Sequence, residues 1–584
     1  MSTNELDIAD EAGDHSSIRA VLDKALLPLM HIDTFDTTLR DGTQGEGVCF
    51  TAEEKLLIVQ KLDELGIDYI EGGWPGSNPK DHRFFSGVRA LRLKHSRIVA
   101  FGATHLIRFS VEDDPSIQAM VQAGTECVAI FGKSWDLHVH RALEISEEQN
   151  LRIIFDTIRY LKAQGKEVIY DAEHFFDGYR ANPAFALRTI EMAKSAGADV
   201  IVLCDTNGGT LTSCVATVSA VVRRQIDGVL GIHAHNDADL AVANTLVAVE
   251  NGFTHVQGCM NGYGERCGNA NLASVIANLE FKMGCTTVGR EKLTDLTEVA
   301  RYVAAVANLA VRGDQPYVGK SAFAHKAGVH VSAVLKDPKT YEHVSPSSVG
   351  NRQRVLVSDL SGRGNVHYKM EEHGLHGLDD QIRLQVLDRV KHMEDEGYEF
   401  ETADGQFELL LRQALRPGVP LFEVASYRVT IGPAGSSANV TVRIADQVRL
   451  AKAKASGPLQ ALDSALRRSL SDLHPAITEV RLKSHKVRVL DWGTGERVRV
   501  LIKWSDDRQA WSTMGVAENV IEAGWLAIID SLRLELMRSE AASDSNLQAL
   551  DFQSPQSAQQ IGSGPVSSSH SHASAGPLHL ALGQ

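Results

Sequence analysis

A repeated unit of helix, glycine stop and short apolar strand constrains the fold of this chain more than any other feature. Four stretches share a helical run that ends in glycine and continues into a β-branched segment: LGIDYIEGGW, AGTECVAIFG, AGADVIVLCD and NGFTHVQGCM. Their glycines, Gly66, Gly124, Gly197 and Gly252, stand where a helix needs a left-handed end. The residues after each glycine are typical of a buried strand.

The first helix shows this pattern clearly, because Thr51 and Glu54 have the spacing of a capping box and the apolar periodicity runs to Gly66. Further strands are predicted in HIDTFDTTL, RIVAFGATH, EVIYDAEHF and LGIHAHND. Eight strands separated by helical segments over about 250 residues predict a TIM (β/α)8 barrel, here spanning residues 29–285. A doubly wound open sheet uses the same units, but no dinucleotide fingerprint follows the first strand.

Composition excludes several classes of protein. The net charge of −15 argues against a nucleic-acid-binding surface, which needs a concentrated basic face. No apolar run is long enough to span a membrane, and the acidic first residues lack the basic region of a signal peptide, so we expect a cytoplasmic protein that does not bind membranes. The seven cysteines show no disulfide-framework spacing and are expected to be reduced.

Polar residues cluster where three of the predicted strands end. The first strand leads to Arg40 and Asp41, the seventh carries His233 and His235 on one side, and the eighth leads to Asn269. Each motif alone has an ordinary explanation, since an Arg-Asp-Gly triplet is usually a turn and a lone His-x-His pair is usually not a metal site. Together, at one face of a barrel, they predict a mixed nitrogen and oxygen site for Mg²⁺, Mn²⁺ or Zn²⁺.

Several motifs also resemble those of a known family. DTTLRDGTQ, HAHND and GYGERCGNANL are similar to the signature set of the metal-dependent barrel family that includes 2-isopropylmalate, homocitrate and citramalate synthases and hydroxymethylglutaryl-CoA lyase. EGGWPGSNPKD, SAFAHKAGVH and SGRGNV resemble the citramalate synthase branch most. The resemblance covers roughly residues 30 to 540. It implies that Asp41, His233, His235 and Asn269 are metal ligands and that Arg40 stabilises the developing oxyanion and binds the keto acid.

The resemblance implies roles for five further residues. Thr206 matches a carboxylate-binding threonine, Gln44 a pocket member, and Glu173 an acidic residue of proton transfer. His330 and Tyr341 match a histidine and a tyrosine that reach into the active site of the partner subunit, which implies a homodimer. From the residues alone, Glu173 remains open to the interpretation of a surface carboxylate, and His330 to that of a structural histidine.

The reaction implied by the resemblance joins the methyl carbon of acetyl-CoA to the ketone carbon of a 2-oxo acid and then hydrolyses the thioester. With pyruvate the product is (R)-citramalate, a step towards isoleucine. The alternatives are 2-oxoisovalerate in leucine biosynthesis, a homocitrate synthase, or a lyase of the hydroxymethylglutaryl-CoA type. A noncatalytic amino-acid sensor is disfavoured because every expected ligand and Arg40 is present.

The remainder of the chain divides into two regions and two terminal segments. Residues 286–420 are expected to form linker subdomains with a helix over residues 290–312, and residues 421–540 to form an α+β domain of two ββα units ending in a helix over residues 518–539. This domain resembles a regulatory domain that pairs with a second copy and binds a branched-chain amino acid; a purely dimerising module is the alternative. Residues 1–28 are expected to be a mobile arm and residues 541–584 a disordered tail.

Overall fold

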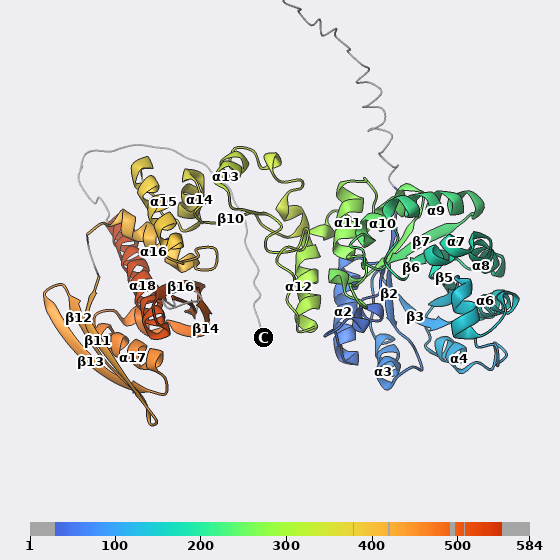
Figure 1. The fold of residues 1–584 in the computed structure, drawn as a ribbon, viewed down its shortest axis with the longest axis horizontal. Coiled ribbons are helices and arrows are strands. Elements are labelled where there is room, and N and C mark those ends of the chain that lie inside the picture. The colour runs from blue at the N-terminus through green and yellow to red at the C-terminus, as the bar shows by residue number, and fades with distance from the viewer. Residues whose placement is uncertain (1–29, 378, 419–420, 491–496, 507, 552–584) are drawn as a thin grey trace, which may run out of the picture. The chain divides into compact units, whose positions relative to one another are not determined.

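Eight parallel strands form a closed barrel in the computed structural model of the chain (Figure 1). They are β1 Asp33–Asp36, β2 Tyr69–Gly73, β3 Arg97–Ala103, β4 Cys127–Lys133, β5 Glu167–Glu173, β6 Val200–Asp205, β7 Val229–Ala234 and β8 His255–Gly258. The barrel closes between β1 and β8, where Asp36 is in register with Gly258. The TIM barrel predicted from the sequence is confirmed, with all eight strands at the predicted places.

The structure describes residues 30–551 except 378, 419–420, 491–496 and 507. The predicted arm, residues 1–28, therefore lies outside the described residues. The chain divides into two compact units, Met1–Lys369 and Met370–Gln584.

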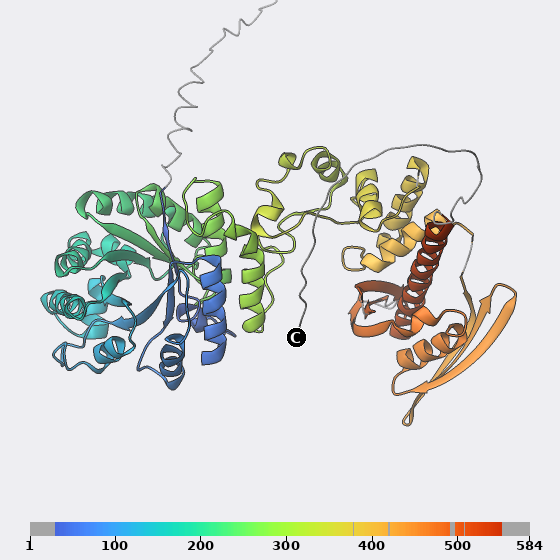
Figure 2. The same ribbon diagram turned by 180° about the vertical axis from the view of Figure 1, so that it is seen from behind.

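Helices surround the barrel strands in both views (Figures 1 and 2). They are α2 Ala52–Leu65, α3 Pro79–Val88, α4 Pro115–Gln122, α5 Asp136–His138, α6 Glu147–Ala163, α7 Phe175–Ala181, α8 Pro183–Ala196, α9 Thr212–Gln225, α10 Ala241–Glu250 and α11 Leu272–Phe281. The capping box of α2 is present, because the Thr51 hydroxyl accepts from Glu54 N and the Glu54 carboxylate accepts from Thr51 N. Gly66 ends this helix with a φ of 95°. Short helical turns occur at η1 Asp41–Gln44, η2 Val139–Leu143 and η3 Met260–Gly262.

Three rings form one layer inside the barrel. Phe35, Tyr69 and His255 are fully or almost fully buried, and their ring centroids lie 5.5 to 6.1 Å apart. This layer comes from the first residues of β2 and β8 and from the middle of β1. The C-terminal ends of the strands form the face that carries the active site in TIM-barrel enzymes.

The segment after the barrel contains mostly short elements. They are η4 Lys292–Asp295, α12 Leu296–Val306, β9 Ala324–His325, α13 Gly328–Val334, η5 Pro338–Thr340, η6 Pro346–Val349, β10 Arg354–Val355 and α14 Arg363–Glu372. The single helix predicted over residues 290–312 is wrong in its length. It starts as the 3-10 turn η4 and ends at Val306, since the backbone turns at Asn308, whose φ is 54°.

The second unit holds two antiparallel sheets, each followed by a helix. Its elements are α15 Asp380–Asp395, α16 Asp404–Leu415, β11 Glu423–Gly432, β12 Gly435–Ile444, β13 Gln447–Ala455, α17 Pro458–Leu470, η7 Pro475–Thr478, β14 Arg481–Val489, β15 Val498–Ser505, β16 Ala510–Ala517 and α18 Val520–Asp551. The duplication is confirmed, but each unit is βββα rather than ββα. Helix α18 includes residues 541–551 of the predicted tail, and residues 552–584 lie outside the described part.

Two chemical expectations concern the chain as a whole. All seven cysteines are free thiols, which agrees with the expected reduced state. Within the described residues, no helix combines the length and apolar character needed to cross a bilayer.

Candidate metal centre and acceptor pocket

The turn after β1 places two of the predicted site residues. The Thr37 carbonyl accepts hydrogen bonds from the backbone N–H groups of Arg40 and Gly42, so the chain reverses as soon as the strand ends. Asp36 and Thr38 both accept from Met260 N, which follows β8. The loop with Arg40 and Asp41 is thus tied to the loop that leads to Asn269.

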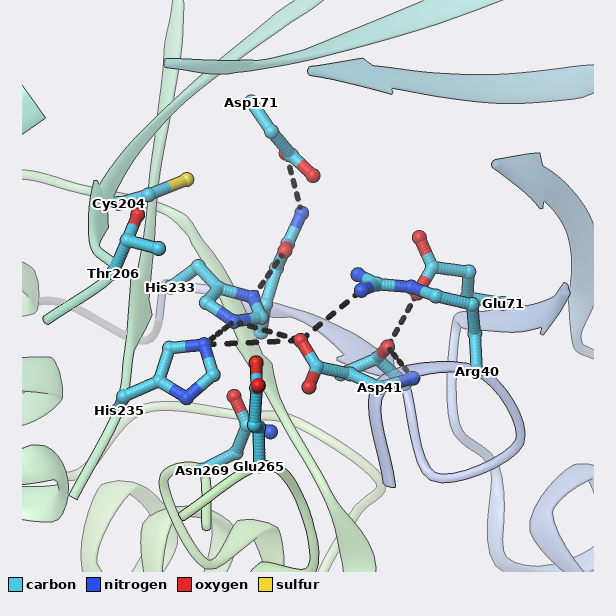
Figure 3. A network of polar contacts seen from close by, with 12 residues as sticks. Arg40, Asp41, Glu71, Asp171, Cys204, Thr206, His233, His235, Glu265 and Asn269 are labelled. Carbon is cyan, nitrogen blue, oxygen red and sulfur yellow. Dashed lines mark hydrogen bonds and ion pairs between the residues drawn. The ribbon is translucent and has the colours of Figure 1, made fainter. Parts of the chain in front are cut away.

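Three of the four predicted metal ligands meet at one point (Figure 3). Asp41 Oδ2 lies 3.4 Å from His233 Nε2 and 3.8 Å from His235 Nε2, and the two Nε2 atoms are 3.4 Å apart. All three side chains are buried. A carboxylate and two imidazoles that present their donor atoms to one another at this spacing form a set that can hold a divalent metal ion.

The fourth predicted ligand, Asn269, adjoins this cluster. Its backbone pairs with that of His235, and its amide nitrogen donates to the Tyr263 carbonyl at 3.1 Å. The Asn269 Oδ1 and Asp41 Oδ1 atoms are buried without a hydrogen-bond partner among the described residues. Buried oxygens are rarely left unsatisfied, so two orphaned acceptors beside two imidazoles fit a cation at this place.

The electrostatics of the cluster also fit a cation. Burial opposes the ionisation of Asp41, but the charge of Arg40, and then the neighbouring His233, hold the pKa of that carboxyl well below its usual range. Burial, and then the neighbouring His233, lower the pKa of His235 to about 4. An ionised carboxylate and a neutral imidazole are the forms that bind metal.

Arg40 is fixed beside the cluster by three groups. Its Nε donates to Glu71 Oε2 at 2.7 Å, and its terminal NH1 donates to Asp41 Oδ2 at 3.1 Å. Its guanidinium carbon lies 3.8 Å from the centre of the Phe101 ring. Burial would lower the pKa of Arg40, but Glu71 and Asp41 outweigh it and raise the pKa. Arg40 therefore presents a permanent, oriented positive charge.

A cavity of about 230 Å³ opens beside Arg40 and the cluster. Its lining contains the predicted Gln44, Glu173 and Thr206 together with residues that the sequence did not indicate: Trp74, Phe101, Phe131, Asp171, Cys204 and Glu265. Glu173 forms an ion pair with Lys133. The Thr206 hydroxyl accepts from His174 N at 2.8 Å.

Two predicted site residues lie elsewhere. His330 on α13 and Tyr341 after η5 stack on each other with ring centroids 4.1 Å apart, and both are exposed. Neither lines the cavity in the barrel of the same chain.

The sequence interpretation missed the buried partners of the site residues. Glu71 is fully buried in the middle of β2, where it accepts from Arg40 and from the Thr37 hydroxyl. Gln257 on β8 and Asp171 on β5 lie behind His233. The sequence did show these polar residues inside otherwise apolar strands. A polar side chain buried in such a strand usually needs a hydrogen-bond partner, so this pattern could have indicated them.

Comparison with curated proteins establishes the family to which this chain belongs. A curated (R)-citramalate synthase of Geobacter sulfurreducens is 47% identical over 518 residues, which cover 87% of this chain and 98% of that protein. An (R)-citramalate synthase of Aquifex aeolicus is 46% identical over 87% of this chain and 98% of its own length. This chain belongs to the (R)-citramalate synthase family. The recognition from sequence motifs is confirmed.

Three family models match successive parts of this chain. The HMGL-like model matches residues 31–303, the homocitrate synthase post-HMGL domain-like model residues 317–398, and the LeuA allosteric (dimerisation) domain residues 401–536. A probable 2-isopropylmalate synthase of Methanopyrus kandleri is more distant, with 31% identity over 85% of this chain and 96% of that protein.

Proposed function

We propose that this chain condenses acetyl-CoA with pyruvate and hydrolyses the thioester, which releases (R)-citramalate and CoA. The observation that carries the proposal is the convergence of Asp41, His233 and His235 beside the fixed charge of Arg40, in the lining of a small cavity. The identity of 46 to 47% to curated (R)-citramalate synthases supports the choice of reaction.

The residues of the site match the charges of this reaction. A divalent ion, Mg²⁺, Mn²⁺ or Zn²⁺, held by Asp41, His233, His235 and Asn269, would supply Lewis-acid polarisation of the ketone. Negative charge moves onto the ketone oxygen as the carbon–carbon bond forms, and Arg40 is oriented to stabilise it. Three further residues line the cavity. We assign Thr206 to binding the carboxylate of the keto acid and Gln44 to the pocket around its oxo-acid group. We assign Glu173 to proton transfer.

The methyl proton of acetyl-CoA must leave before the new bond forms. We assign its transfer to His330 and Tyr341 of a second copy, because these two rings lie exposed and outside their own barrel's cavity. The match of residues 401–536 to a dimerisation domain supports a homodimer.

The cavity supports an acid with an uncharged side chain, such as pyruvate, over an acid with a second carboxylate. Trp74 packs edge-on against Phe101 and Phe131 at 5.8 and 5.9 Å, and the two phenylalanines stack at 5.4 Å. This aromatic wall offers an apolar surface to the side chain of the acid. Among the lining residues, Arg40 is the one arginine or lysine, so the second carboxylate of 2-oxoglutarate lacks a cation.

The LeuA match also supports feedback regulation, for which we propose a branched-chain amino acid, isoleucine first and leucine second. Adding isoleucine to the assay described next is expected to slow the enzyme and thus to place the reaction on the route to isoleucine. An unchanged rate with both amino acids would contradict this part of the proposal.

The assay measures thiol released from acetyl-CoA in the presence of Mn²⁺ or Mg²⁺, with pyruvate, 2-oxobutyrate, 2-oxoisovalerate and 2-oxoglutarate in parallel. Pyruvate is expected to give the highest kcat/KM, and treatment with a chelator to abolish the signal until metal is restored. The variant His235→Ala is expected to be inactive at the same metal concentration. The highest turnover with 2-oxoisovalerate would indicate a 2-isopropylmalate synthase, and thiol release from none of the four acids would refute the condensation.

A further inference from the structure

We propose that Asp171 and Gln257 form a buried relay that fixes the tautomer of His233, so that its Nε2 lone pair faces the metal cluster. The inference deepens the proposed function and rests on its metal site. Gln257 bonds His233, and Asp171 reaches His233 only through Gln257, so we assign both a positioning role, although Asp171 also lines the cavity.

The relay joins residues of three strands. Gln257 Oε1 lies 2.8 Å from His233 Nδ1, and Gln257 Nε2 lies 3.1 Å from Asp171 Oδ1. Gln257 on β8 is in register with His233 on the neighbouring β7, whereas Asp171 comes from β5. All three are buried, with exposed fractions of 5% or less.

The direction of the relay follows from which groups can donate. In its ionised form the Asp171 carboxylate can only accept, so Gln257 turns its amide NH₂ towards it and its carbonyl oxygen towards His233. A carbonyl oxygen only accepts, and therefore His233 carries its proton on Nδ1. The Nε2 atom, 3.4 Å from both Asp41 Oδ2 and His235 Nε2, is left with a lone pair.

The reverse orientation shows what Asp171 contributes. With the amide flipped, the NH₂ group of Gln257 would face His233 Nδ1, and the imidazole would carry its proton on Nε2. That proton would point at the cluster and would have to leave before a metal could bind. Outer partners of this kind typically change metal affinity by about 10- to 100-fold when they are removed.

Exchanging the carboxylate of Asp171 and the amide of Gln257 tests whether these residues orient His233 or are only a structural pair of buried polar residues. In the double variant Asp171→Asn with Gln257→Glu, only oxygen and nitrogen atoms change places and the net charge is kept. The carboxylate introduced on β8 can still accept from His233 Nδ1, and the amide introduced on β5 can donate to its second oxygen. In Asp171→Asn alone, the introduced amide can donate or accept, so the orientation of Gln257 is no longer imposed.

The experiment titrates the metal-free, full-length protein with Mn²⁺ and follows binding by electron paramagnetic resonance. Gln257→Leu is expected to weaken binding by about 10- to 100-fold. Asp171→Asn is expected to weaken it less, and the double variant to regain most of the loss. Asn244→Leu is the matched control, because it removes a buried amide that bonds Thr210 O and the Thr212 hydroxyl on the outer layer, and it should bind Mn²⁺ like the wild type.

A second readout does not depend on metal. The ¹⁵N chemical shifts of His233 in the metal-free wild type and double variant should report a proton on Nδ1, and those in Gln257→Leu a shift of population towards Nε2–H. Wild-type affinity in Gln257→Leu, or a double variant that binds no better than Asp171→Asn, would overturn the relay while leaving the metal site intact. Failure of the wild type itself to bind Mn²⁺ would refute the metal site and the relay together.

Discussion

At the scale of single residues, Arg40 is the group whose chemistry is hardest to replace. Its planar fork donates to Glu71 and Asp41 while its face lies on Phe101. A lysine keeps the charge but offers one point donor and no face to stack. We expect Arg40→Lys to lower kcat by about 100-fold or more in the thiol-release assay, as loss of one oriented donor to an oxyanion does.

The control for this variant is Arg312→Lys, a change at an exposed arginine that pairs with Asp314, and it should leave the rate unaltered. Mn²⁺ affinity should be retained in Arg40→Lys, because Arg40 is not a ligand. An Arg40→Lys enzyme that turns over as fast as the wild type would show that the charge need not be oriented.

The residues found from the sequence are those that stand in recognisable motifs at strand ends, as Asp41, His233 and Asn269 do. Glu71, Asp171 and Gln257 could not be found in this way, because they lie within strands that are distant in the chain. Only the register of a closed barrel brings them behind the site, as when His233 and Gln257 become direct neighbours. The aromatic wall of the cavity was hidden for the same reason.

At the scale of elements, the loop after β2 is held by a buried ion pair. Lys55 on α2 donates to Asp81 Oδ1 at 2.6 Å and to the Gly72 carbonyl at 2.9 Å, and Asp81 Oδ2 accepts from Trp74 N. Lys55→Met leaves the Asp81 carboxylate buried without its cation, and we expect a loss of about 3–5 kcal/mol in the free energy of unfolding of the barrel. Thermal unfolding followed by circular dichroism measures it.

Two comparisons make this test specific. Adding Asp81→Asn to Lys55→Met should recover part of the stability, since the uncompensated charge is removed. Lys61→Met, which breaks the exposed pair with Glu64, should change the unfolding free energy by less than about 1 kcal/mol. A Lys55→Met protein as stable as Lys61→Met would contradict the role of the buried pair.

Helices and strands that carry clear sequence features, such as a capping residue or an apolar periodicity, were predicted. Those that lack such features were missed. The helix α2 has its capping box and glycine stop, and its predicted bounds agree with the structure. The strands β13 and β16 were missed, and for β13 the reason is visible in QVRLAKAKA, where Ala453 is the one fully covered side chain. That strand forms because it pairs with β12 along its whole length, which is information outside its own sequence.

At the scale of the whole molecule, the second unit leaves part of its inner sheet faces uncovered. Helix α18 packs on β15 and β16, while β14 is the edge strand of the same sheet. Val487 is in register with the fully buried Val500 yet is 49% exposed, and Leu482 and Val489 are similarly exposed. We propose that these apolar side chains on the sheet edge belong to the interface of a homodimer, in which a second copy of the unit covers them.

Val487→Lys is therefore expected to shift the protein from dimer to monomer in sedimentation velocity. It should also lower the rate of thiol release, since His330 and Tyr341 would no longer reach a partner's site. Lys486→Ala, on the opposite face of β14, is the control and should stay dimeric. A wild type that sediments as a monomer with full activity would refute the proposed exchange of residues between copies.

The central claim is that remote parts of the chain converge on one cation that binds the keto acid beside Arg40. Anomalous diffraction at the manganese edge, from crystals of the full chain grown with Mn²⁺ and pyruvate, tests it most directly. We predict one peak in the barrel, at about 2.0–2.3 Å from Asp41, His233 and His235, with Asn269 Oδ1 and pyruvate oxygens adjoining it. Manganese bound elsewhere, with no metal at these four side chains and with pyruvate away from Arg40, would contradict the account.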